Sequence, residues 1–128
     1  MKVPFVDLKA QYLSLKDEFD AAVAQVLSET AFISGKYATA FENQFADYLG
    51  VGHCVACANG TDAIEIALKA IGVEPGDEVL LPANTFIATA EGVSNIGAEP
   101  VFVDLDPQYY HIDPAKIEEK ITPQTKAI

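Results

Sequence analysis

Basic residues are scarce in this chain: its 128 residues include 8 Lys and Arg against 19 Asp and Glu, for a formal net charge of -11. Nucleic acids and anionic membrane surfaces are bound through basic patches, so this charge argues against both as partners. It does not exclude a phosphate-bearing small molecule, because backbone N–H groups can bind a phosphate locally.

Long apolar runs are missing as well. Residues 1–7 lack the apolar stretch of a signal peptide. No run approaches the ~18 apolar residues that a membrane span requires. We therefore expect a cytoplasmic protein without a membrane partner.

Cysteine is limited to Cys54 and Cys57, with His53 beside them. One interpretation is a zinc site or a redox-active thiol pair, but zinc usually takes four ligands and His111 is the only other histidine. A structural disulfide is not expected in a reducing compartment. We expect two buried core cysteines and no metal site.

Apolar residues recur at helical spacing in the first part of the chain and in shorter runs after Gly52. The pattern predicts helices at roughly 15–29, 41–49, 64–71, 86–96 and 113–120, with strands at 54–57, 78–81, 101–103 and 125–128. Strands and helices that alternate in this way are typical of an α/β layer with a largely parallel sheet. In such sheets, ligands collect where strands lead into helices.

Residues 58–63 lie between a predicted strand and a predicted helix. Unpaired N–H groups at the start of a helix attract an anion, Gly60 lets the backbone approach it closely, and Thr61 adds a hydroxyl donor. This pattern indicates a phosphate site. The alternative is an ordinary turn in which Asp62 and Glu65 form a capping arrangement.

Phe86 directly follows the end of another predicted strand, at the same sheet edge as Gly60 if the strands are parallel. An aromatic ring there could stack on a flat cofactor ring, a contact worth ~1 kcal/mol beyond burial. The alternative is a core phenylalanine at the start of a helix.

Four segments resemble, in order and spacing, the DegT/DnrJ/StrS family of aminotransferases that act on nucleotide-linked keto-sugars. They are NGTDA at 59–63, GVEPGDEV at 72–79, NTFIAT at 84–89 and GAEPVFVD at 97–104. The segments 4–8, 32–35, 41–46 and 112–128 match the family pattern as well. The resemblance therefore covers essentially the whole chain.

The resemblance implies an α/β fold, the large domain of the aspartate-aminotransferase type (fold type I), with pyridoxal 5'-phosphate as cofactor. Gly60 and Thr61 match the family's contacts to the cofactor phosphate, and Phe86 matches the aromatic that lies against the pyridine ring. Ser34 and Gly35 match a loop that borders the sugar substrate. The family is usually homodimeric, and each active site borrows residues from the partner subunit.

The implied reaction transfers an amino group from an amino acid, expected to be glutamate, to a nucleotide-linked keto-sugar. Its product would serve amino-sugar and cell-surface polysaccharide biosynthesis. In this family the Schiff-base lysine and the acidic partner of the pyridine nitrogen lie beyond position 128. We therefore expect residues 1–128 to be the amino-terminal part of the large domain, truncated, inactive alone and without a catalytic residue.

The remaining titratable groups carry weaker patterns. Lys69 is expected to pair with Glu65 on a helix surface, and Lys36 to lie in the loop 32–36. Asp104 and Asp106 resemble paired acid–base carboxylates, but are expected to form the turn after a strand. Two functional alternatives remain open: a sugar dehydratase of the same family, and a non-catalytic module that binds a phosphorylated ligand or a protein partner.

Overall fold

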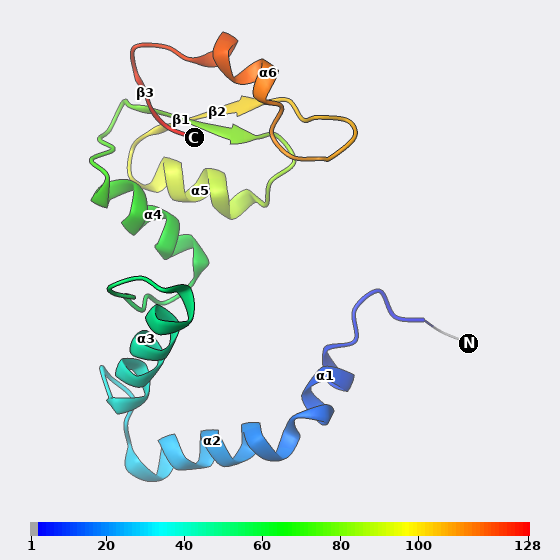
Figure 1. Ribbon diagram of the computed structural model, residues 1–128, viewed down its shortest axis with the longest axis vertical. Helices are drawn as coiled ribbons and strands as arrows, with labels where there is room; N and C mark the ends of the chain where they lie inside the picture. Colours follow the sequence, from blue (N-terminus) through cyan, green and yellow to red (C-terminus); the bar gives the residue numbers. More distant parts are fainter. Residues whose placement is uncertain (1–2) are drawn as a thin grey trace. The chain divides into compact units, whose positions relative to one another are not determined.

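The computed structural model describes residues 3–128, which form two compact units in succession along the chain (Figure 1). The first unit reaches Ala56 and the second comprises Cys57–Ile128. Among these residues, no helix has both the length and the apolar character that crossing a bilayer requires.

The first unit is helical, with α1 (Leu8–Ser14), α2 (Lys16–Glu29) and α3 (Lys36–Leu49). The helix predicted at 15–29 is confirmed by α2. The second predicted helix is longer than expected, because Lys36 is its first residue and not part of the preceding loop. The short helix α1 was not predicted; the Asp7 carboxylate caps it by accepting a hydrogen bond from the Ala10 N–H at 2.9 Å.

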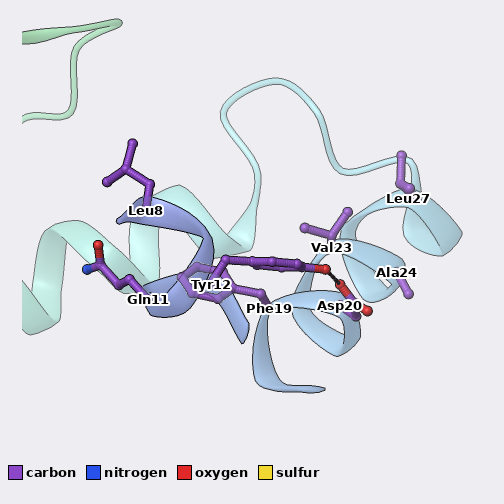
Figure 2. Close-up of a pocket in the computed structure, with 8 residues that line it drawn as sticks. All are labelled: Leu8, Gln11, Tyr12, Phe19, Asp20, Val23, Ala24 and Leu27. Atoms are coloured by element: carbon purple, nitrogen blue, oxygen red, sulfur yellow. Dashed lines mark hydrogen bonds between the residues drawn. The ribbon is translucent and has the colours of Figure 1, made fainter. Parts of the chain in front are cut away.

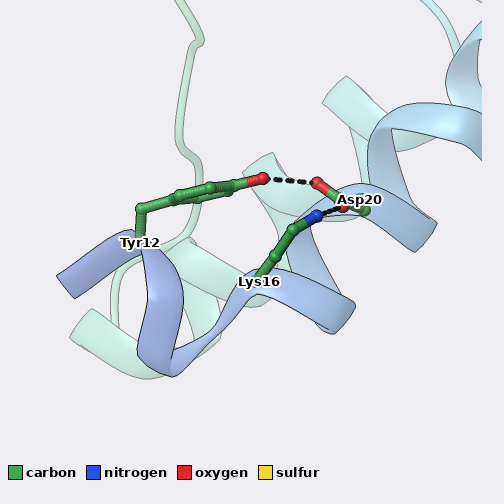
Figure 3. A network of polar contacts seen from close by, with 3 residues as sticks. All are labelled: Tyr12, Lys16 and Asp20. Carbon is green, nitrogen blue, oxygen red and sulfur yellow. Dashed lines mark hydrogen bonds and ion pairs between the residues drawn. The ribbon is translucent and has the colours of Figure 1, made fainter. Parts of the chain in front are cut away.

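This helical unit buries little of its apolar surface. Ala46 is its only buried residue among those described, whereas Phe19, Val23 and Leu27 are more than half exposed. Apolar side chains of α1 and α2 face a groove of about 560 Å³ (Figure 2). Beside it, Asp20 accepts a hydrogen bond from the Tyr12 hydroxyl at 2.9 Å and pairs with Lys16 (Figure 3).

The second unit is an α/β layer. Its elements are α4 (Gly60–Ala70), β1 (Glu78–Pro82), α5 (Ile87–Asn95), β2 (Glu99–Val103), α6 (Pro114–Ile117), a 3-10 turn (Glu118–Lys120) and β3 (Thr125–Ala127). All strand pairs are parallel, and the order is β2-β1-β3. The predicted parallel α/β layer is confirmed, together with three of its four strands.

The chain steps from β1 to β2 through α5, and then back across β1 to β3 through α6. Because crossovers between parallel strands are right-handed, a reversal of direction places the two helices on opposite faces of the sheet. Figure 1 shows α5 and α6 on either side of the strands. The connections that leave the carboxyl ends of β1 and β2 therefore diverge.

The core of this unit lies between the sheet and the helices α4 and α5. Val79 and Leu81 of β1 face this cluster, and the intervening Leu80 is fully buried on the other face. A central parallel strand covered on both faces explains the continuous apolar run at 79–81. The cluster consists of Leu68, Val73, Val79, Leu81, Ala90, Val93, Ile96 and Ala98.

The strand predicted at 54–57 is wrong. The segment forms no ladder with any described strand, and Val55 is 79% exposed. Its backbone makes one hydrogen bond to a distant described residue: the Ala56 N–H donates to the Glu42 carboxylate at 2.8 Å. An apolar segment becomes a strand only when a neighbouring backbone satisfies its N–H and C=O groups, and here none does.

Candidate functional site

The amino terminus of α4 carries free hydrogen-bond donors. Asn59 is the capping residue: its side-chain oxygen accepts from the Asp62 N–H at 3.0 Å, and its carbonyl accepts from the Ala63 N–H at 3.1 Å. The two preceding N–H groups, of Gly60 and Thr61, have no acceptor within residues 3–128. The start of a helix always leaves such donors, and here they are not consumed by a neighbouring element.

Space beside these donors is open. A β-carbon built on Gly60 would meet no atom within 4 Å, and Gly60 is exposed. The half-buried Thr61 adds a hydroxyl group with no hydrogen-bond partner in the described part of the chain. Two N–H donors, one O–H donor and the positive end of a helix dipole together suit a phosphate group.

The capping arrangement proposed for Asp62 and Glu65 is wrong. Asn59 performs the capping, and the Glu65 carboxylate accepts a hydrogen bond of 2.6 Å from the Asn95 side chain. Lys69 therefore does not pair with Glu65 as predicted. The turn at 58–60 thus leaves its donors available, and Glu65 instead joins α4 to α5.

The helices α4 and α5 run side by side in the same direction (Figure 1). A β-carbon at Gly92 would lie 3.6 Å from the Thr61 carbonyl oxygen, and one helical turn further on Glu65 meets Asn95. Both helices begin at the end of the unit where β1 and β2 finish. The first turn of α4, with Gly60 and Thr61, therefore lies beside Gly92 of α5, and Phe86 lies earlier along the chain, immediately before α5.

Phe86 is the residue that caps the start of α5, and its backbone is extended, with φ -66° and ψ 145°. Its side chain is 78% exposed, so it is not a core phenylalanine. That alternative is wrong. Its exposed ring is available for contact with a ligand, and stacking on a flat ligand ring stays a prediction.

Ser34 and Gly35 lie in the first unit, apart in sequence from the three residues above. Ser34 has a left-handed backbone, with φ 44°, and Gly35 precedes α3. A β-carbon on Gly35 would lie 3.3 Å from the Ala31 carbonyl oxygen, so a larger residue would force this loop to shift. Just after the loop, Lys36 pairs with Glu29 at 2.7 Å.

Lysines that act as nucleophiles need a lowered pKa, and two paired lysines of this chain, Lys36 and Lys16, show the opposite. The Glu29 carboxylate raises the pKa of Lys36, and the Asp20 carboxylate raises that of Lys16. Lys116 pairs with Asp104 at 3.2 Å. The charged forms of Lys36 and Lys16 are thus stabilised, and the absence of a catalytic lysine from residues 1–128 stays a prediction.

Cys57 is exposed and Cys54 is half-buried, so the prediction of two buried core cysteines is wrong. The Cys57 thiol contacts the Asn59 carbonyl oxygen at 3.4 Å, next to the start of α4.

The predicted turn after β2 is correct: the Asp106 carboxylate accepts from the Gln108 and Tyr109 N–H groups at 2.8 and 2.9 Å.

Comparison with known proteins gives concordant matches. A family model described as the DegT/DnrJ/EryC1/StrS aminotransferase family matches residues 13–128. UDP-2-acetamido-2-deoxy-3-oxo-D-glucuronate aminotransferase of Pseudomonas aeruginosa is 48% identical over 126 residues, covering 98% of this chain and 35% of that protein.

Two solved structures have the same fold over this region. DesV of S. venezuelae is similar with a TM-score of 0.91 and 42% identity, over 98% of this chain and 34% of that one. The ntda protein of Bacillus subtilis, solved with bound cofactor PMP, has a TM-score of 0.91 and 43% identity, over 98% of this chain and 29% of that one. This chain spans about a third of the length of the curated relatives it matches. The predicted fold class is confirmed.

Proposed function

The chain belongs to the DegT/DnrJ/EryC1/StrS aminotransferase family, and from this premise we propose that it is part of a pyridoxal-phosphate-dependent sugar aminotransferase. In this proposal, residues 1–128 form the amino-terminal part of the large domain. The enzyme transfers an amino group from an amino acid, which we propose to be glutamate, to a nucleotide-linked keto-sugar. Amino-sugar and cell-surface polysaccharide biosynthesis is the proposed role, in the cytoplasm and as a homodimer.

The observation that carries this proposal is the set of hydrogen-bond donors at the start of α4. The N–H groups of Gly60 and Thr61 and the Thr61 hydroxyl would donate hydrogen bonds to the cofactor phosphate. No arginine or lysine is needed for this, which agrees with a chain of net charge -11. Backbone donors also fix the position of the phosphate, because they belong to a helix packed against α5.

Phe86 would then provide the platform for the pyridine ring. Its ring is 78% exposed, and Phe86 immediately precedes α5, the helix that packs against α4. When bound, the cofactor supplies the electron sink for amino transfer. The residues of this chain bind and orient it, and Phe86 keeps water from one face of the ring.

Ser34 and Gly35 are proposed to border the sugar substrate. The left-handed backbone at Ser34 and the close approach of Gly35 to Ala31 define one shape for this loop. A fixed loop with an exposed serine hydroxyl suits the recognition of sugar hydroxyl groups. The lysine that binds the cofactor covalently, and the acidic residue that pairs with its ring nitrogen, are proposed to lie outside residues 1–128.

The test uses the intact protein. After incubation with pyridoxal phosphate and reduction with borohydride, peptide mass spectrometry should find one lysine adduct, and none on the lysines within 1–128. An adduct within these residues would contradict the proposed division of the site.

Activity is tested with glutamate and a nucleotide-linked keto-sugar. We expect 2-oxoglutarate to form in equal amount to the amino-sugar. A sugar that loses a hydroxyl group without formation of 2-oxoglutarate would identify a dehydratase instead. Binding of pyridoxal phosphate without either product would indicate a non-catalytic binding module.

A further inference from the structure

The turn 83–86, which carries Phe86, lies at the carboxyl edge of the sheet, where the loop 104–113 also begins. Because α5 and α6 leave on opposite faces, the connection 83–86 after β1 diverges from the loop 104–113 after β2. Between them lies an open cavity of about 610 Å³. A cavity at this position leaves the turn 83–86 without close packing on one side, so its conformation depends on specific hydrogen bonds.

The ring of Phe86 cannot fix its own position. At 78% exposure it has few neighbours that restrict it, so the backbone of the turn must set where it points. Two backbone hydrogen bonds define that turn. The Ala83 N–H donates to the Val103 carbonyl at 2.9 Å, and the Thr85 N–H donates to the Pro82 carbonyl at 3.2 Å.

Asn84 lies between these two bonds and makes the one side-chain link from the turn to the loop 104–113 within the described residues. Its Nδ2 donates to the Tyr110 carbonyl oxygen at 3.1 Å, across 26 positions of sequence. Asn84 is exposed, so this contact does not serve to bury apolar surface.

The acceptor is held firmly. Tyr110 has a left-handed backbone, with φ 57°, which a residue other than glycine rarely adopts. Its N–H donates to the Asp106 carbonyl at 2.9 Å, and the Asp106 carboxylate binds the intervening N–H groups of Gln108 and Tyr109. The loop thus presents the Tyr110 carbonyl in one orientation, toward Asn84.

We propose that Asn84 is a positioning residue: its side-chain amide ties the turn 83–86 to the Tyr110 carbonyl and thereby sets the orientation of the Phe86 ring over the cofactor. This inference rests on the proposed function. Asn84 touches neither the phosphate donors of α4 nor the core, so its loss should affect recognition of the ring and leave phosphate binding and folding unchanged.

The test is a double-mutant cycle on the intact apoprotein, read by equilibrium dialysis with pyridoxal phosphate. Asn84→Ala and Phe86→Ala should each weaken binding by about two- to tenfold, the range for one net hydrogen bond or one ring contact. Because both changes remove the same ring contact, the double variant should bind no more weakly than Phe86→Ala. The affinity for inorganic phosphate, measured by competition, should be the same in the two single variants, the double variant and the wild type.

Asn43→Ala is the control. Asn43 is an exposed asparagine of α3 in the first unit, and its side chain makes no hydrogen bond to any described residue. This variant should bind pyridoxal phosphate like the wild type.

Three results would overturn the inference: an Asn84→Ala variant with wild-type affinity, an additive double variant, or an equal loss of phosphate and pyridoxal phosphate binding. Other results would contradict the proposed function itself. In that case the wild-type apoprotein does not bind pyridoxal phosphate, or Phe86→Ala has no effect.

Discussion

Gly92 of α5 lies directly against Ile64 of α4: a β-carbon at position 92 would be 2.9 Å from Ile64 Cγ2 and 3.1 Å from Ile64 Cβ. The two helices can approach this closely only because residue 92 has no side chain. The same contact brings α5 within reach of the Thr61 carbonyl, so the position of the phosphate donors depends on it.

The first prediction is that Gly92→Ala destabilises the protein. The added methyl group must displace the partly buried side chain of Ile64, and overpacking of this kind costs about 1–3 kcal/mol. Urea denaturation followed by circular dichroism measures the change in the free energy of unfolding. A variant as stable as the wild type would mean that α4 and α5 separate easily, which contradicts the close contact.

The second prediction is that Gly60→Ala weakens the binding of pyridoxal phosphate without destabilising the protein. The substitution adds the same methyl group as Gly92→Ala, but at a position with free space around it. No atom lies within 4 Å of the added β-carbon, so the free energy of unfolding should stay equal or rise by up to about 1 kcal/mol. Affinity for pyridoxal phosphate should fall, because the methyl group obstructs the close approach of a phosphate to the backbone. Equal affinity in dialysis would argue against a phosphate site at this turn.

A third prediction concerns the pH dependence of the loop 104–113. The N–H groups of Tyr109 and Gln108, in this order of effect, hold the pKa of the Asp106 carboxyl below its ordinary value of 3.8. A lowered pKa in the folded protein means that the carboxylate stabilises the loop above pH 3.8 and that this contribution is lost as the pH falls through the lowered value. In an NMR titration, the amide signals of residues 108 and 109 should shift together with a midpoint below 3.8.

Asp106→Asn is the control for this titration. In this variant the NMR amide signals of residues 108 and 109 should no longer shift together as the pH is lowered. A wild-type midpoint at or above 3.8 would show that the two N–H groups do not favour the charged carboxylate.

The fourth prediction is that Glu78→Ala loosens β3. The Glu78 carboxylate accepts from the hydroxyl groups of Thr122 at 2.5 Å and Thr125 at 3.3 Å, just where β3 begins. Hydrogen bonds to a charged group are each worth about 1.5–3 kcal/mol, so hydrogen exchange at residues 125–127 should accelerate. Glu99→Ala is the matched control, because Glu99 pairs in register with Glu78 but is exposed and makes no side-chain hydrogen bond to any described residue. Equal exchange in both variants would contradict the prediction.

The sequence predicts the sheet well wherever a strand is central and buried. The run at 79–81 is apolar because both faces of β1 are covered, and no other element suits it. The segment 54–57 has the same apolar character, but whether it becomes a strand depends on a partner backbone, which no local pattern reveals. The seven residues of α1 are too few to establish a helical period.

The free donors at the start of α4 can be predicted in their location and not in their detail, and their role as a phosphate site stays a prediction. The Asn59-Gly60-Thr61 turn between an extended segment and a helix indicates free N–H groups, and the structure has them. That Asn59 caps α4 in place of Asp62 depends on the backbone angle of Asn59, since several nearby polar residues can cap. The sequence does not predict the bond between Asn84 and Tyr110, because it joins two loops that only the folded sheet brings together.

The order of the strands also has a consequence for how the second unit assembles. Glu78 pairs with Glu99 on one side and with Thr125 on the other, so the β1–β2 pair closes a much shorter loop than the β1–β3 pair. Closing the shorter loop costs less entropy, and distant pairings form more slowly. We therefore expect β1, α5 and β2 to form the nucleus of folding, with β3 the last strand to join and the first to detach.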